Sequence, residues 1–109
     1  MGGKRNADPE GTPAEREEAA RLRIYPVQCK HVDPSLSGDA SDQWIAGIAR
    51  TPEEAEAGAK ALEAADPDAW NCYEPRGGID LGAFAKAQNL DPLLLYRKIV
   101  RAGPGLVLL

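Results

Sequence analysis

The side chains of this 109-residue chain that are best suited to chemistry are four cations in its last third, Lys86, Arg97, Lys98 and Arg101. Ammonium and guanidinium groups bind phosphate oxygens, and they also donate hydrogen bonds to guanine in the major groove of DNA. What these cations bind depends on the elements that position them. The alternative is that they are ordinary solvated charges on a helical hairpin.

The other reactive side chains do not form a metal-binding or catalytic pattern. Cys29, His31 and Cys72, with Asp33 as a fourth ligand, lack the paired spacing of structural zinc sites. His31 has no serine nucleophile pattern and no carboxylate at a fixed spacing. We expect one cysteine in a strand, the other in the core, and no metal site.

The glycine pair and the acidic pairs also have simple explanations. Gly77-Gly78 is not followed by Lys-Ser/Thr, so it opens no phosphate-binding loop. Glu53-Glu54 and Asp66/Asp68 are explained as helix caps and helix ends. We therefore expect a protein that is not an enzyme, with no catalytic residue and no cofactor.

The composition is that of one small globular domain. Hydrophobic residues make up 43% of the chain and charged residues 28%, but aromatic residues only 6%, which favours amphipathic helices over an aromatic-rich β-sandwich. The net charge of −4 by itself argues against a nonspecific nucleic-acid binder. However, residues 51–75 carry one basic and seven acidic residues, whereas residues 76–109 carry five basic and two acidic residues.

The sequence indicates a cytoplasmic protein that does not contact a membrane. No apolar run reaches the roughly 18–20 residues of a membrane helix. Met1-Gly2-Gly3-Lys4-Arg5 is followed by acidic residues and proline, unlike a secretory signal. Two cysteines are too few for a disulfide framework.

The N-terminal residues 1–20 contain almost no bulky apolar side chain. We expect a mobile tail there and a single small domain over residues 21–109. Within the tail, Thr12-Pro13-Ala14-Glu15 has a capping sequence, which predicts a short helix through Arg21 with no apolar face.

Residues 22–50 predict a β-hairpin. The first strand covers residues 22–32, where Pro26 indicates an edge strand because proline has no amide donor. Residues 33–42 are rich in Pro, Ser, Gly and Asp and predict a loop. The second strand covers residues 43–50.

Thr51-Pro52-Glu53-Glu54 is the strongest local signal in the chain. Threonine at the N-cap, proline at the first position and glutamate three residues on predict a capped helix over residues 51–65. Asp66-Pro67-Asp68 ends this helix. The residues that follow predict a compact apolar patch, Trp70, Cys72 and Tyr73, and then a turn.

Residues 80–102 predict two helices separated by a tight turn. Asp80 caps a first helix over residues 81–88, and Asn89 tolerates the left-handed conformation at its end. Asp91-Pro92 starts a second helix that runs to residue 102. Ala85 is small enough to let the two helices approach, and the expected core anchors are Leu90, Leu95 and Ile99. The apolar segment Leu106–Leu109 is expected to pack on the domain as a strand or to bind a partner.

The sequence AKAQNLDPLLLYRKI at residues 85–99 resembles the helix-turn-helix of site-specific DNA invertases, resolvases and many small bacterial regulators. The resemblance covers residues 79–99. It implies that Arg97 faces the major groove or a phosphate and that Lys98 and Arg101 bind backbone phosphates. It also implies that Lys86 meets a phosphate where the first helix crosses the backbone.

Three residues at the start of the second helix complete the implied DNA-binding set, Asp91, Leu93 and Leu94. Where the two leucines stand, this motif usually has Ser, Thr, Gln or Arg. Leucine can contact the methyl group of thymine but cannot form a hydrogen bond with a base.

A second resemblance involves the first half of the chain. Tyr25-Pro26-Val27, Trp44 and Thr51-Pro52-Glu53-Glu54-Ala55 are similar to the N-terminal half of HicB-type antitoxins, which couple a toxin-binding domain to a C-terminal DNA-binding domain. The chain lacks the Pro-Gly-Cys turn of that family.

Together these patterns predict an α+β, mostly α fold, in which a short β-hairpin precedes a small helical domain that ends in a helix-turn-helix. The expected function is double-stranded DNA binding, as in a small transcriptional regulator or a phage or plasmid accessory factor, by a homodimer or beside a protein partner. The alternative is a protein–protein interaction module, such as an antitoxin-like adaptor or a phage assembly component. In that case Leu93, Leu94 and Leu106–Leu109 form a docking face. Burial of Leu93 and Leu94 beside an open basic face favours DNA, and their exposure favours docking.

Overall fold

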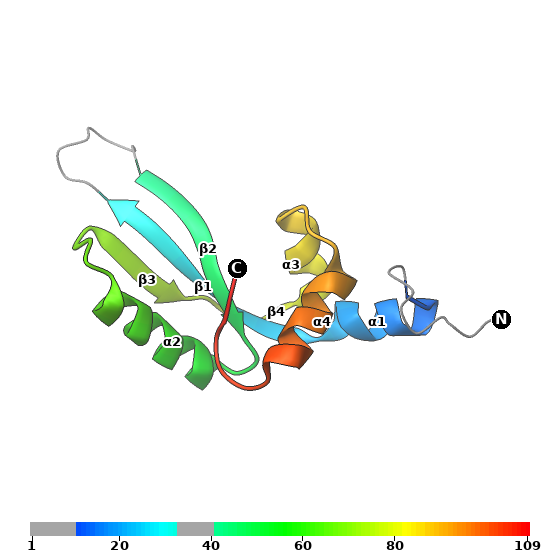
Figure 1. Cartoon of the computed structure of the whole chain (residues 1–109). Helices are drawn as coiled ribbons and strands as arrows, with labels where there is room; N and C mark the ends of the chain where they lie inside the picture. Colours follow the sequence, from blue (N-terminus) through cyan, green and yellow to red (C-terminus); the bar gives the residue numbers. More distant parts are fainter. Residues whose placement is uncertain (1–10, 33–40) are drawn as a thin grey trace. The chain divides into compact units, whose positions relative to one another are not determined.

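The computed structural model describes residues 11–32 and 41–109, which form two compact units (Figure 1). The helical unit contains the described residues up to Arg23 together with Ile79–Gly103, and the sheet unit contains those of Ile24–Gly78 and Pro104–Leu109. The described residues form four helices and five strands, so the predicted α+β class is confirmed. In chain order these elements are α1 (Pro13–Arg21), β1 (Arg23–Val32), β2 (Ser41–Ala49), α2 (Pro52–Ala65), β3 (Asn71–Pro75), β4 (Ile79–Asp80), α3 (Leu81–Ala87), α4 (Pro92–Ala102) and β5 (Val107–Leu108).

The predicted hairpin is present, but it is part of a larger antiparallel sheet. The strands of the sheet unit follow the order β3-β1-β2-β5, and Val27 of β1 faces both Gly47 of β2 and Pro75 of β3. β3 was not predicted as a strand. It contains Cys72 and Tyr73, which were expected to form a compact apolar patch with Trp70. Most of the predicted loop, including Asp33, lies outside the described residues.

The prediction that Pro26 lies in an edge strand is wrong, because β1 lies between β2 and β3. The Pro26 carbonyl accepts a 2.8 Å hydrogen bond from the Arg76 amide, just beyond the end of β3. In a strand, the amide and carbonyl of one residue point to the same neighbour. The donor that Pro26 lacks would face Arg76, one residue beyond the end of β3, so the missing bond falls at the end of the β1–β3 pairing.

The helix predicted over residues 51–65 is confirmed as α2. The Thr51 hydroxyl accepts from the Glu54 amide at 3.1 Å, as its capping sequence predicts. α2 packs on the sheet through a small core of Val27, Ala49, Ala55 and Ala59. Alanines on the helix allow a close approach to the strands.

The C-terminal apolar segment packs on this core, which is one of the two predicted outcomes. β5 pairs with β2, with Val107 opposite Ile48, and Leu106 lies between two glycines. A Cβ atom on Gly58 would lie 2.9 Å from the Cβ of Leu106, and one on Gly47 would lie 3.0 Å from its Cγ. The glycines therefore create the space that Leu106 fills.

The helical unit contains α1, β4, α3 and α4, and each of its helices contacts the other two. Its buried residues are Ala19, Leu81, Phe84, Ala85, Leu93, Leu95 and Ile99. Ala19 is the single fully buried residue of α1, so the helix packs without a continuous apolar face, as predicted. A Cβ atom on Gly82 of α3 would lie 2.8 Å from the Cβ of Ala20, so small residues bring α1 against α3.

The short helix predicted from the capping sequence at Thr12 is confirmed as α1, which ends at Arg21 as expected. Residues 1–10 of the expected tail lie outside the described residues. The Thr12 hydroxyl accepts from the Glu15 amide and the Glu15 carboxylate accepts from the Thr12 amide, so both bonds of a capping box are present. Across residues 11–32 and 41–109, no helix is long and apolar enough to cross a membrane.

Candidate nucleic-acid interface

The turn between α3 and α4 has the cap geometry that the sequence predicts. Asn89 is in the left-handed region with φ +59°, the conformation expected of it. The Leu90 amide donates to the Ala85 carbonyl at 2.8 Å and the Asn89 amide to the Lys86 carbonyl at 3.2 Å. These two bonds are those of a Schellman motif. They fix the direction in which the chain leaves α3.

The start of α4 is set by Asp91. Its side chain accepts from the Leu93 amide at 2.9 Å and contacts the Arg16 guanidinium of α1 at 3.4 Å. The bond from the Leu93 amide, assisted by Arg16, lowers the pKa of Asp91 below its usual value. Asp91 is thus a helix cap tied to α1, a role that occupies the carboxylate proposed for DNA binding.

The predicted cap of α3 is only partly as expected. Asp80 is the N-cap residue, but its side chain makes no capping hydrogen bond. It pairs instead with Arg23 at 3.3 Å, while the Leu81 amide donates to the Leu22 carbonyl at 2.7 Å. The first turn of α3 is therefore anchored to the segment that follows α1.

The two leucines of the expected interface have different environments. Leu93 is fully buried and lies against Gly11, next to the start of α1, so its side chain is not available to a ligand. Leu94 is 56% exposed. Among the predicted core anchors, Leu95 and Ile99 are buried, but Leu90 is 45% exposed and the prediction for it is wrong.

The exposed side of α4 combines one apolar and two basic residues. Leu94, Lys98 and Arg101 are exposed and follow the spacing i, i+4, i+7, which places them on one face of a helix. We call these three residues the α4 face. α4 contains no acidic residue, so this face carries only positive charge.

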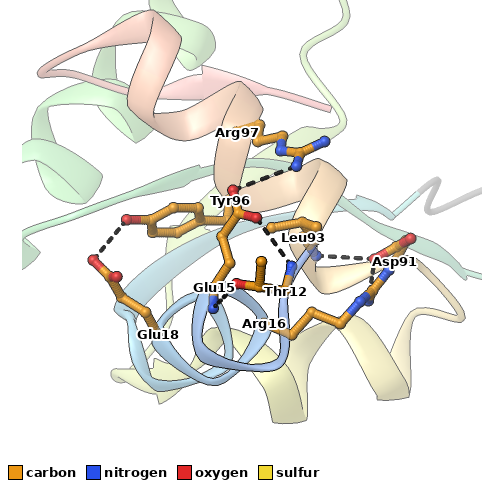
Figure 2. Close-up of polar contacts among 8 residues, drawn as sticks. All are labelled: Thr12, Glu15, Arg16, Glu18, Asp91, Leu93, Tyr96 and Arg97. Atoms are coloured by element: carbon orange, nitrogen blue, oxygen red, sulfur yellow. Dashed lines mark hydrogen bonds and ion pairs between the residues drawn. The ribbon is translucent and has the colours of Figure 1, made fainter. Parts of the chain in front are cut away.

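Arg97, at the margin of this face, contacts α1. Its Nη2 atom lies 3.4 Å from Oε2 of Glu15, whose other oxygen belongs to the capping box with Thr12 (Figure 2). One carboxylate thus joins the cap of α1 to Arg97. A second contact between these helices is the Tyr96 hydroxyl, which donates to Glu18 at 3.2 Å.

Sequence reasoning did not find the α1 partners of this region. Glu15, Arg16 and Glu18 stand in a segment expected to be a tail, and no spacing relates them to residues more than 70 positions later. Lys86, by contrast, is exposed in the last turn of α3, as a phosphate contact would require.

The residues considered for metal binding or catalysis have structural partners in the sheet unit. Both cysteines lie in strands, Cys29 in β1 and Cys72 in β3, and only Cys29 is buried, so it is the core cysteine. His31 Nδ1 lies 2.7 Å from Asn71 Oδ1 and 3.5 Å from Asp68 Oδ2. Within the part of the chain that the structure describes, no three His, Cys, Asp or Glu side chains are grouped to hold a metal ion.

Asp66 organises the connection from α2 to β3. It accepts from the Tyr73 hydroxyl at 2.6 Å and from the Asn71 side-chain amide at 2.8 Å. These hydrogen bonds lower the pKa of Asp66 and raise the pKa of Tyr73, and burial raises the pKa of Cys29 beside Tyr73. These hydrogen bonds fix the turn between α2 and β3.

The comparisons with known proteins found no relative. The chain matches no protein-family model, no curated protein and no solved structure.

Proposed function

We propose that the helical unit binds double-stranded DNA, with α3 and α4 acting as a helix-turn-helix and the α4 face directed at the duplex. The observation that carries the proposal is that face, which presents Lys98 and Arg101 beside Leu94 on a helix without acidic residues. Cations at regular helical spacing suit the phosphates that border a groove.

The local charge supports this proposal better than the net charge does. Residues 76–109 contain only two acidic residues, Asp80 and Asp91. Both are paired with arginines from the first part of the unit, Arg23 and Arg16. Neither carboxylate is therefore an unscreened negative charge facing a phosphate.

The proposed roles follow from exposure. Lys98 and Arg101 contact phosphates, Lys86 contacts a phosphate from the end of α3, and Arg97 joins them when it leaves Glu15. A single recognition helix makes few contacts, so we propose that the chain acts as a homodimer or beside a partner protein, as a small regulator or an accessory factor would.

Charge-removing variants test these roles. Lys98→Ala and Arg101→Ala should each reduce the slope of log K against log salt concentration by about 0.9, because each loses one phosphate contact. Lys60→Ala is the matched control, since Lys60 is an exposed cation on α2 of the other unit. If Lys60→Ala weakens binding as much as Arg101→Ala does, the α4 face is not the binding surface.

The second candidate is protein docking, and the exposure of Leu94, Leu108 and Leu109 favours it. However, three residues of the expected docking face pack inside their own units. Leu93 and Val107 are buried, and Leu106 packs on α2. Docking of a protein partner would depend on Leu94 and would not require binding to a duplex, so absence of duplex binding favours docking.

A further inference from the structure

The first turn of α4 presents one exposed side chain. Among Pro92, Leu93, Leu94 and Leu95, only Leu94 is exposed, because Leu93 and Leu95 are buried and Pro92 is half-buried. In a helix-turn-helix, the N-terminal residues of the second helix are those that reach base edges in the major groove. Leu94 is therefore the residue of this turn that is available to a base.

The chemistry of leucine restricts what it can recognise there. Its side chain neither donates nor accepts hydrogen bonds, so it cannot distinguish the polar edges of the base pairs. The major groove offers one apolar group, the C5-methyl of thymine. A methyl group against Leu94 also removes from water a side chain that is 56% exposed in the free protein.

The neighbouring charges favour DNA over an apolar partner surface. Lys98 and Arg101 lie on the same helical face as Leu94, one and two turns further along. An apolar partner would have to desolvate these two cations, whereas a duplex gives them phosphates while Leu94 enters the groove. An apolar side chain beside two cations is therefore complementary to a major groove that presents a thymine methyl group between two rows of phosphates.

We infer that Leu94 reads the thymine methyl group and gives this chain a preference for thymine-containing duplexes. The inference rests on the proposed DNA binding and adds the specificity of the same surface. Loss of one methyl contact should weaken binding roughly fourfold, the value of one buried carbon.

The test compares an alternating dA·dT duplex with the same duplex made with deoxyuridine, which lacks only the C5-methyl group. Both probes carry the same backbone charge and the same hydrogen-bonding edges. The wild-type chain should bind the thymine duplex roughly fourfold more tightly, and Leu94→Ala, with its shorter side chain, should show a smaller difference between the two duplexes. Val100→Ala is the matched control, because Val100 is 51% exposed on another side of α4 and should keep the preference.

The outcomes separate the two claims. If the wild-type chain binds both duplexes equally and with salt dependence, DNA binding stands and thymine reading by Leu94 is refuted. If Leu94→Ala keeps the full preference, another residue reads the methyl group and the inference is wrong. If the wild-type chain binds neither duplex, the proposed function fails and the inference fails with it.

Discussion

At the scale of single residues, neighbours in the sequence have opposite roles. Leu93 is fully buried beside Gly11, and Leu94 is exposed on the α4 face. Leu93→Ala should lower the free energy of unfolding by about 2–5 kcal/mol, the cost of a cavity in a packed core. Leu94→Ala should change it by less than about 0.5 kcal/mol. Urea unfolding of the two variants measures this difference, and equal losses would contradict the assignment of Leu93 to the core.

Glu15 restrains one of the cations proposed to bind DNA. Because its carboxylate pairs with Arg97, Glu15→Gln should remove this ion pair while the amide keeps the capping bond to Thr12. We expect the variant to bind a duplex up to about fivefold more tightly, because an exposed ion pair is worth at most about 1 kcal/mol. The salt dependence of binding should also become steeper.

The control for this effect is Glu17→Gln, which removes the same charge from α1 but breaks a pair with Arg21 of the same helix. An equal gain in the control would mean that Arg97 has no special part and that only the charge of α1 matters.

At the scale of elements, small residues determine how the helices meet. Gly82→Ala places a Cβ atom 2.8 Å from the Cβ of Ala20 and 3.2 Å from its carbonyl oxygen. Alanine favours a helix by about 1 kcal/mol over glycine, but the overpacking of backbone atoms costs about 1–3 kcal/mol. We expect a net loss of stability and a lower Tm. Gly77→Ala is the control, because no atom lies within 4 Å of its added Cβ. If the Tm of Gly82→Ala equals or exceeds that of Gly77→Ala, the close contact between α1 and α3 is refuted.

Elements with strong local signals could be predicted from the sequence. Thr51-Pro52 and Asp91-Pro92 start α2 and α4 through local hydrogen bonds, and Asn89 takes the left-handed conformation that its side chain tolerates. These signals lie within a few residues of the structure they specify. They therefore do not depend on the rest of the fold.

Features that depend on distant partners could not be predicted. β3 is a strand because it pairs with β1, and this pairing makes β1 a central strand despite Pro26. The burial of Leu93 depends on Gly11 and α1, which are more than 70 residues away in the chain. The sequence patterns therefore assigned Leu93 and Leu94 to one role, whereas Leu93 is buried and Leu94 is exposed.

At the scale of the whole molecule, two aspartates with lowered pKa values, Asp66 and Asp91, make the stability of the fold depend on pH. Hydrogen bonds hold the pKa of Asp66 below its usual value of 3.8, so the unfolded chain takes up the proton more readily than the folded chain. The stabilisation is fully present above pH 3.8 and is lost as the pH falls through the lower folded-state pKa. The lowered pKa of Asp91 acts in the same direction.

Asp66→Asn tests this dependence. We expect the variant to be less stable at pH 7 and to lose less of its remaining stability than the wild-type chain between neutral and acid pH. Urea unfolding at a series of pH values measures both effects. Asp42→Asn, at an exposed position of β2, is the control. If Asp66→Asn loses as much stability between neutral and acid pH as the wild-type chain does, the Asp66 network does not contribute to the pH dependence.

The distribution of charge is also a property of the whole chain. The net charge of −4 includes the seven acidic residues of positions 51–75, whereas the five basic residues of positions 76–109 include those of α3 and α4. If one basic face drives DNA binding, the affinity should fall with salt concentration with the shallow slope of a few phosphate contacts. A generally basic protein would show a steeper slope.

The most direct test of the account is the salt dependence of duplex binding by the wild-type chain. Phosphate contacts from Lys98, Arg101 and Lys86 predict a linear plot of log K against log salt concentration with a slope of about −3. Release of Arg97 from Glu15 would make the slope steeper by about 0.9. Absence of binding at low salt, or binding with no dependence on salt, would contradict the claim that the α4 face is a DNA-binding surface.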